Sequence, residues 1–478
     1  MELTRVRVEQ GELQGTTLPS GVRLFAGVPY AATPVGTLRL RPPAPPDPWY
    51  AVRDATAFAA PSLQQLGGSE DCLTLNVWAP SSPGPHPVLV WVFGGGFESG
   101  SASPPGVDGS LLADALGAVV VAANYRLGAL GWLHLADVGV PGSTNLGLQD
   151  QLAALRWVHA NIAAFGGDPH RVTLGGVSAG AFVIGSLLAV PEARGLFARA
   201  ALHSGAAGRT YPRETATAIA QDLLAALGCN DVDDLMRLPA ERILETQGSV
   251  IDQDIGQRNL PGGRSWGLVV DGVVLAEDPF QAVARGDAVD VDLLICTAAE
   301  EVRLYQVMQA PTFSPEDEQA LLDEIARAGH DEPKLLLDGY RARHPEADLT
   351  ALRARFLTDA IYRVPAARLA DAHVAAGGRA WSSVQTASPV GPALGPCHGS
   401  DLPYLFAGMS VAGLPPIGED QFPVRDRLHA AFRGFVHDGD PGWPSHAAGT
   451  PTTYDYGDGT LRLDPPDDAI TAAWRELG

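Results

Sequence analysis

The chain has little positive charge. Lys334 is its only lysine, and 33 Lys and Arg face 55 Asp and Glu, which gives a formal net charge of −22. A protein this acidic repels phosphate backbones and anionic lipid headgroups. The composition therefore argues against a nucleic-acid partner and against binding to a membrane surface.

The chain is also poor in cysteine and in long apolar runs. Its four cysteines show no C-x-x-C spacing, which argues against a zinc site and gives no disulfide framework. No apolar run reaches the roughly 18 residues that a membrane span needs, and the first residues carry no apolar leader segment. We expect no metal, no membrane partner and a cytoplasmic location.

What the chain does have is ample material for a core, with 46% hydrophobic and 18% charged residues. Residues 3–30 alternate apolar and polar with glycine breaks, as short antiparallel strands do. The runs 87–93 and 118–124 are apolar without alternation, which is typical of strands covered on both faces.

Further strands and helices alternate after these runs. Residues 146–165 carry apolar residues at helical spacing, and strand-like segments follow before position 178, at 198–203, at 290–296 and at 380–384. This rhythm predicts an α/β fold with a large, mostly parallel sheet flanked by helices. We expect a single domain over 1–478, with helical insertions at about 206–285 and 305–375.

The segment 171–181, Arg-Val-Thr-Leu-Gly-Gly-Val-Ser-Ala-Gly-Ala, holds the most informative motif. It places a G-x-S-x-G pentapeptide between a β-branched run and an alanine-rich helical stretch, as a nucleophile elbow does. Gly176 and Gly180 would let two pieces of backbone approach closely and expose Ser178 on the turn. A glycine-rich connection with an incidental serine is the alternative.

An activated serine needs a base, and in doubly wound hydrolases the chain order is Ser, then Asp or Glu, then His. His203 comes too early for this order. His398 lies in the loop Gly395-Pro-Cys-His-Gly-Ser400, just after a predicted strand, where a catalytic base belongs. The acid should follow the strand at 290–296, where spacing alone does not separate Glu300 from Glu301.

The glycines of Val92-Phe-Gly-Gly-Gly-Phe-Glu-Ser-Gly100 directly follow an apolar strand. Successive glycines can turn backbone N–H groups toward a negative charge, as an oxyanion hole requires. A phosphate-binding loop is the alternative, but the segment lacks G-x-G-x-x-G and a G-K-[ST] ending.

With these motifs in place, the chain resembles the type B carboxylesterases, which include bacterial para-nitrobenzyl esterases, animal carboxylesterases and cholinesterases. The resemblance runs nearly end to end. Beside the elbow, the motifs that carry it are Phe25-Ala-Gly-Val-Pro-Tyr-Ala31, Ser69-Glu-Asp-Cys-Leu-Thr-Leu-Asn-Val77, Trp91 to Gly100, Asn124-Tyr-Arg-Leu-Gly-Ala-Leu-Gly131, Asn145-Leu-Gly-Leu-Gln-Asp-Gln151, Phe165-Gly-Gly-Asp-Pro169, His203-Ser-Gly205 and His398-Gly-Ser-Asp-Leu-Pro-Tyr404.

The resemblance implies an α/β-hydrolase fold and assigns roles position by position. Cys296-Thr-Ala-Ala-Glu-Glu301 is similar to the family signature that ends in the triad acid, which favours Glu301. The remaining implied roles are the nucleophile Ser178, the base His398, the oxyanion donors Gly95, Gly96 and Ala179, and Ser204 near the acid.

Three positions depart from the family pattern. Val177 stands where the family has a glutamate before the nucleophile, so the imidazolium formed in catalysis should be less stabilised. No cysteine precedes Cys72, so the disulfide that secreted members form at this motif cannot form here. Ile295-Cys296 replaces the usual Ile-Gly before the acid.

The resemblance implies a serine carboxylesterase that needs no cofactor, takes a small-molecule ester and water, and works as a monomer or small homo-oligomer. A carbamate or amide hydrolase with the same triad, and a non-catalytic binding protein, remain as alternatives. Phe97, Trp132 and Phe182 lie near the site in sequence and are candidates for the pocket, although core packing explains them equally well. Segments 255–285 and 411–424 are candidates for its rim.

Overall fold

A large mixed sheet runs through the molecule. The computed structural model describes residues 2–310, 312–389, 391–406, 416–447 and 452–463, together with residues 470 and 474. The strands are β1 (Glu2–Val8), β2 (Gly11–Thr17), β3 (Arg23–Pro29), β4 (Arg53–Asp54), β5 (Thr74–Ala79), β6 (His86–Val92), β7 (Val119–Ala123), β8 (Gly167–Val177), β9 (Arg199–His203), β10 (Thr210–Tyr211), β11 (Leu268–Val269), β12 (Asp292–Ala298), β13 (Ala380–Gln385), β14 (Thr452–Asp455) and β15 (Leu461–Leu463).

The strand order is β1-β2-β3-β5-β7-β6-β8-β9-β12-β13-β14-β15, with β4 beside β2. Neighbours from β7 to β14 are parallel. The pairs β1–β2, β2–β3, β3–β5, β5–β7 and β14–β15 are antiparallel, and the short β4 pairs parallel with β2. The predicted α/β fold, with a mostly parallel sheet and extra N-terminal antiparallel strands, is confirmed.

Helices cover the sheet in two groups. α1 and α16 pack together, and α16 contacts β6 and β8, whereas α3 and α4 contact β8, and α14 contacts β12 and β13. The helices are α1 (Gly109–Leu116), α2 (Gly128–Trp132), α3 (Leu146–Asn161), α4 (Ala179–Leu187), α5 (Arg213–Leu227), α6 (Val232–Arg237), α7 (Ala240–Thr246), α8 (Ile255–Asn259), α9 (Pro279–Arg285), α10 (Arg303–Met308), α11 (Glu318–Arg327), α12 (Pro333–Arg343), α13 (Leu349–Thr358), α14 (Val364–Ala375), α15 (Leu402–Leu405) and α16 (Phe422–Asp438).

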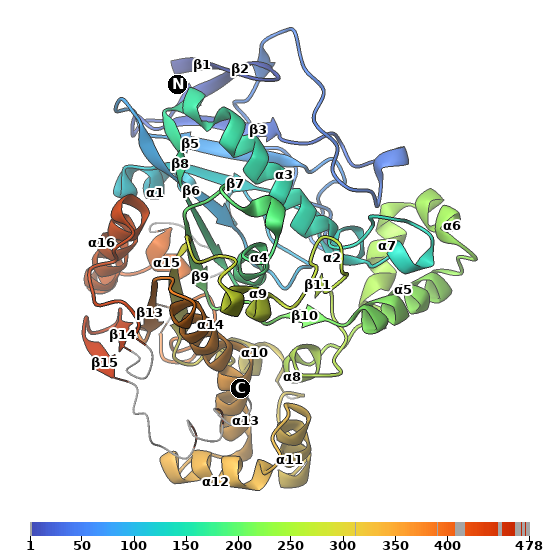
Figure 1. Ribbon diagram of the computed structural model, residues 1–478, viewed down its shortest axis with the longest axis vertical. Coiled ribbons are helices and arrows are strands. Elements are labelled where there is room, and N and C mark those ends of the chain that lie inside the picture. Colours follow the sequence, from blue (N-terminus) through green and yellow to red (C-terminus); the bar gives the residue numbers. More distant parts are fainter. Residues whose placement is uncertain are drawn as a thin grey trace.

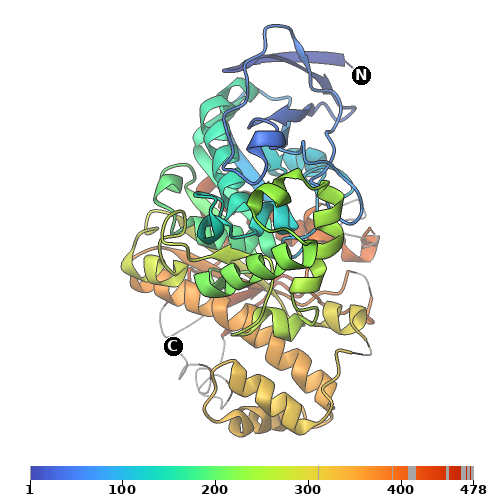
Figure 2. The ribbon, with the colours of Figure 1, turned by 90° about the vertical axis from the view of Figure 1, so that its right-hand side faces the viewer.

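The two ends of the long axis differ in structure. The N-terminal strands lie at one end and α11, α12 and α13 at the other, in both views (Figures 1 and 2). The stretch 206–285 holds α5 to α9, but it also holds β10 and β11, a short parallel pair that was not expected. No helix among the described residues is both long and apolar enough to cross a membrane.

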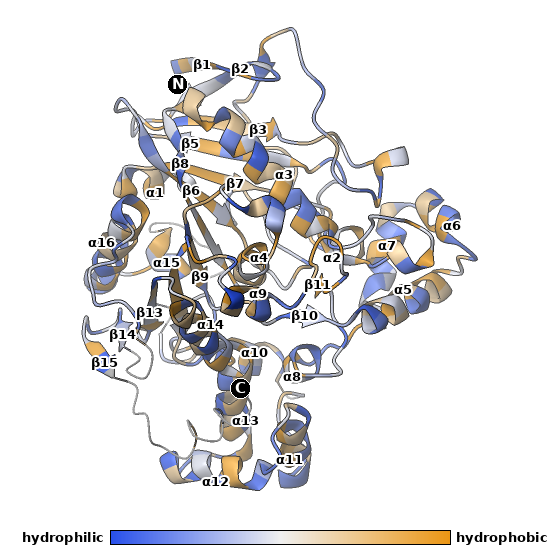
Figure 3. Ribbon diagram, viewed as in Figure 1, coloured by the Kyte–Doolittle hydropathy of each residue, from blue (hydrophilic) through white to orange (hydrophobic). Residues whose placement is uncertain are grey.

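The core lies around the central strands, where hydrophobic residues gather (Figure 3). Every residue of β7 is buried, as are Val88 to Val92 of β6. All nine residues of α4 are buried as well. A helix that is apolar on all sides lies inside a protein, so the segment after Ser178 is held firmly between sheet and neighbouring helices.

The turn between β8 and α4 depends on two glycines. A Cβ on Gly180 would lie 2.1 Å from the Val92 carbonyl oxygen, and one on Gly176 would lie 2.8 Å from the same atom. Ser178 adopts φ 56° and ψ −124°, which is strained for a residue with a side chain. Its N–H donates to the His203 carbonyl at 2.9 Å. The tight turn expected of a nucleophile elbow is therefore present.

A buried ion pair lies next to this turn. His203 Nδ1 contacts Asp401 Oδ2, and the two side chains are 0% and 9% exposed. Burial alone would lower the pKa of His203, but its neighbours Cys296 and Asp401 raise it to about 10. Burial opposes ionisation of Asp401, yet His203 holds the pKa of this carboxyl below its usual range. Both groups are therefore charged at neutral pH.

The pair should make stability depend on pH. The raised pKa of His203 stabilises the fold fully below its ordinary value of 6.5, and this contribution is lost as pH rises through about 10. We predict that Asp401→Asn lowers the free energy of unfolding by about 3–5 kcal/mol near pH 6, because it leaves a buried charge unpaired. The loss should shrink at pH 10. Urea denaturation at both pH values measures it.

Asp371→Asn is the matched control, because Asp371 pairs with His446 but its side chain is 58% exposed. This substitution should cost about 1 kcal/mol or less. An equal loss of stability for Asp401→Asn at pH 6 and pH 10 would contradict the ion pair.

Candidate active site

The structure brings His398 and Glu301 into direct contact. His398 Nδ1 lies 2.7 Å from Glu301 Oε2, and Glu301 is 0% exposed. The other carboxylate oxygen, Oε1, accepts the Ala298 N–H at 2.7 Å. With Nδ1 donating to the carboxylate, the imidazole presents Nε2 as an acceptor.

Glu300 lies in a different environment. Its side chain is 34% exposed and lies 3.4 Å from Arg303 Nη1. Sequence spacing did not distinguish Glu300 from Glu301, but the structure does, because only Glu301 contacts His398.

Main-chain hydrogen bonds join the loops that carry the two residues. The His398 N–H donates to the Glu301 carbonyl at 3.2 Å, and the Glu300 N–H donates to Pro396 O at 3.0 Å. His398 Nε2 is buried and has no hydrogen-bond partner among the described residues. The imidazole is therefore fixed on one side and unengaged on the other.

Ser178 lies at the same edge of the sheet as this pair. Val177 of β8 and Cys296 of β12 are both in register with His203 of β9, so β8 and β9 end level and β12 ends two residues further on, at Ala298. Ser178 directly follows β8, and Glu301 comes three residues after the end of β12. Successive strands thus deliver the serine and the acid to one edge, as in other open parallel sheets.

The glycine loop after β6 contacts the elbow. A Cβ on Gly94 would lie 2.9 Å from the Ser178 Cβ. Gly95 and Gly96 have φ of +119° and +65°, conformations that favour glycine. Among the described residues, no acceptor takes the main-chain N–H of Gly95, Gly96 or Ala179. These three groups are available to a negatively charged oxygen.

Ser204 directly follows β9 and links it to β12, the strand that leads to Glu301. Its N–H donates to the Cys296 carbonyl at 2.8 Å, and its φ is 51°. The contact that the structure shows is made by its backbone, on the β12 strand that leads to Glu301.

Two tyrosines that the sequence did not single out flank the histidine. The ring centroid of His398 lies 4.9 Å from that of Tyr362 and 5.6 Å from that of Tyr305. Tyr362 in turn lies 6.4 Å from Phe182 of α4. Both tyrosines come from the helical stretch after Glu301, and no sequence motif marks them.

The predicted pocket residues are all buried. Phe97 packs edge-on against Trp132 with centroids 4.6 Å apart, and Phe182 faces Tyr362. Phe97, Trp132 and Phe182 are 0%, 3% and 2% exposed. Of the predicted rim, residues 411–415 lie outside the described residues.

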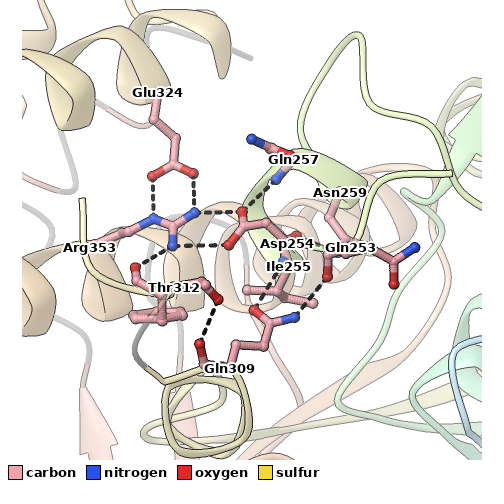
Figure 4. Close-up of polar contacts among 10 residues, drawn as sticks. Gln253, Asp254, Ile255, Gln257, Asn259, Gln309, Thr312, Glu324 and Arg353 are labelled. Atoms are coloured by element: carbon pink, nitrogen blue, oxygen red, sulfur yellow. Dashed lines mark hydrogen bonds and ion pairs between the residues drawn. The ribbon is translucent and has the colours of Figure 1, made fainter. Parts of the chain in front are cut away.

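The other predicted rim segment, which begins with α8, is anchored by Arg353 (Figure 4). Arg353 donates to both oxygens of Glu324 at 2.7 Å and to both oxygens of Asp254, at 2.6 and 3.1 Å. The Asp254 side chain also accepts the Gln257 N–H and so caps α8. The rim is therefore tied to α11 and α13.

From α8 the contacts continue to the glycine loop. Arg258 forms an ion pair with Glu98, whose N–H donates to the Gly95 carbonyl at 3.1 Å. The helical stretch at one end of the molecule thus connects through Arg353 and Arg258 to the loop beside Ser178. No group of His, Cys, Asp and Glu suited to a metal ion occurs among the described residues.

Known proteins are similar to this chain in sequence and in fold. The model of the carboxylesterase family matches residues 2–459. The para-nitrobenzyl esterase of Bacillus subtilis is 34% identical over 466 residues, which cover 92% of each chain. The phenmedipham hydrolase of Pseudarthrobacter oxydans is 32% identical over 478 residues, 94% of each chain.

Solved structures agree with these relatives. Carboxylesterase EST55 of Geobacillus stearothermophilus at pH 6.2 superposes with a TM-score of 0.90 at 34% identity, covering 98% of this chain and all of that one. A PNB esterase gives a TM-score of 0.84 at 34% identity, covering 97% and 98%. On sequence and on fold, the chain belongs to the carboxylesterase family and is a carboxylic-ester hydrolase.

Proposed function

We propose that Ser178, His398 and Glu301 are the catalytic triad of this esterase. One observation carries the proposal: the buried 2.7 Å contact between His398 and Glu301, which leaves Nε2 unengaged at the edge of the sheet where Ser178 lies. A serine is a weak nucleophile until a base takes its proton. His398 Nε2 is the group suited to do so.

The reaction follows from these roles. Ser178 Oγ attacks the ester carbonyl while His398 takes its proton, and Glu301 holds the imidazole and stabilises the imidazolium. The oxyanion accepts hydrogen bonds from the N–H groups of Gly95, Gly96 and Ala179. Removal of one such donor typically costs about 10²–10³ in rate.

His398 then gives its proton to the departing alkoxide, and the acyl group stays on Ser178. Water attacks this acyl-enzyme with the same base, which releases the acid and restores the serine. The family comparisons do not favour the alternative of a carbamate or amide hydrolase.

In this proposal Ser204 supports the position of Glu301 through its backbone, because its N–H donates to the Cys296 carbonyl of β12. We further propose that the enzyme works in the cytoplasm, as a monomer or a small homo-oligomer. Its four cysteines, Cys72, Cys229, Cys296 and Cys397, are free thiols, which suits a reducing compartment.

Replacing the nucleophile tests the proposal directly. Ser178→Ala should lower kcat for 4-nitrophenyl acetate by at least about 10⁴-fold, because no covalent intermediate can form. Stopped-flow absorbance should show a burst of nitrophenol with the native enzyme, if acylation is faster than deacylation, and none with the variant. Circular dichroism should be unchanged. Undiminished turnover by the variant would overturn the assignment of Ser178.

The neighbouring glutamates provide a matched pair. Glu301→Gln should lower kcat roughly 10³- to 10⁴-fold, because an amide can hold the wrong imidazole tautomer and cannot stabilise the imidazolium. Glu300→Gln should change kcat by no more than about threefold, since it loses only a partly exposed ion pair. Steady-state kinetics on both variants decide. The opposite pattern would show that Glu300 is the acid.

A further inference from the structure

Arg209 places a positive charge against two aromatic rings, Phe97 and Phe182, of the segments that form the proposed site. It is partly buried in the loop between β9 and β10. Its guanidinium carbon lies 5.1 Å from the ring centroid of Phe97 and 5.7 Å from that of Phe182. Phe97 follows the oxyanion glycine Gly96, and Phe182 lies one helical turn beyond Ser178, where its N–H donates to the Ser178 carbonyl.

No carboxylate of the described residues forms an ion pair with this guanidinium. Arg209 Nη2 donates to Ser265 Oγ at 3.3 Å, and Nε is buried with no hydrogen-bond partner among the described residues. Among the residues that the structure describes, no Asp or Glu oxygen lies within ion-pair distance of Arg209. An arginine taken out of bulk water normally has an acidic partner.

A second arginine makes the local charge more unusual. Arg258 Nε donates to the same Ser265 oxygen at 3.2 Å, and Arg258 has Glu98 as its ion-pair partner. Two guanidinium groups thus meet at one hydroxyl, and among the described residues only Arg258 has a carboxylate partner. Two like charges that share one hydrogen-bond acceptor repel each other. The guanidinium of Arg209 is thus a positive charge without an acidic partner among the described residues, in a protein whose net charge is −22.

The charge of Arg209 extends to the tyrosines beside His398. Burial raises the pKa of Tyr305 and of Tyr362, and Arg209 acts against this rise at both phenols. The guanidinium fork matches a carboxylate in two parallel hydrogen bonds, and the adjoining rings form apolar walls. This chemistry fits a substrate that is apolar near its ester group and anionic at a short distance from it.

The contacts also indicate which part of the substrate carries the anion. The alcohol must leave past His398, which protonates it and is flanked by Tyr305 and Tyr362. Arg209 instead lies against the oxyanion loop and the first turn of α4. The direct contacts of Arg209 are with the rings of Phe97 and Phe182, whereas its influence on the two tyrosines is electrostatic only, so its side of the site is assigned to the acyl group.

We propose that Arg209 binds a carboxylate on the acyl part of the substrate, so that the enzyme prefers monoesters of dicarboxylic acids. This inference rests on the proposed role of Ser178.

The test compares monoethyl glutarate with ethyl 5-methylhexanoate, in which an isopropyl group replaces the carboxylate. Ethanol release at pH 7.5 gives kcat/KM for each ester. In Arg209→Gln, the ratio of kcat/KM for the anionic ester to that for the neutral ester should fall roughly 10- to 100-fold, the typical effect of losing a charge-assisted hydrogen bond. Arg209→Lys, which keeps the charge, should retain part of this ratio.

Arg242→Gln is the control for net charge, because Arg242 is an exposed residue of α7 with a side chain 56% accessible. It should leave the ratio unchanged. An Arg209→Gln enzyme in which both esters slow equally would show that Arg209 only packs against the rings, and would overturn the proposal. A preference confined to O-acetylglycolate, whose carboxylate is on the alcohol part, would also overturn it. If the native enzyme hydrolysed neither neutral nor anionic esters, the proposed triad itself would fail.

Discussion

The close contact between the backbones of β6 and α4 is the constraint on which the site depends. Only a hydrogen atom fits at the Cα of Gly180, because a Cβ would lie 2.1 Å from the Val92 carbonyl oxygen. This contact holds α4 against the end of the strand that carries the glycine loop. It also obliges the chain to turn sharply at Ser178, whose φ of 56° a residue with a side chain adopts only under constraint. One steric condition thus sets the position of Ser178, the proposed nucleophile, and of the glycine loop beside it.

The surroundings of the turn keep it in this state. The Ser178 N–H donates to the His203 carbonyl oxygen, and the His203 side chain is held by Asp401, three residues after His398. His398 and Glu301, the proposed base and acid, are joined by their side chains and by their main chains. Rigid supports of this kind would let the proposed catalytic groups react without first losing conformational freedom. The Arg353 cluster extends the support to the rim through α8 (Figure 4).

Most of the fold could be predicted from the sequence, because strands buried on both faces leave unbroken apolar runs. The runs at 87–93 and 118–124 correspond to β6 and β7 within one residue or so. The helix expected over 146–165 is α-helical as far as Asn161 and continues as a 3-10 turn to Phe165, where Gly166 with φ 87° ends it. Ser178 and His398 carried motifs. The acid did not follow from spacing, because Glu300 and Glu301 are adjacent and differ only in the direction of their side chains. Arg209, Tyr305 and Tyr362 could not be predicted, since only the packing of separate segments of the chain brings their side chains to the site.

The most direct test of the account is the position of a covalent adduct. An alkyl phosphonate with a 4-nitrophenyl leaving group reacts with a serine only where a base activates it and an oxyanion hole receives the phosphoryl oxygen. Intact-mass spectrometry followed by peptide mapping should find one phosphonyl group per chain, on Ser178, and none in the Glu301→Gln variant within the same time. An adduct on another residue, or a native enzyme that stays unmodified, would contradict the proposed site.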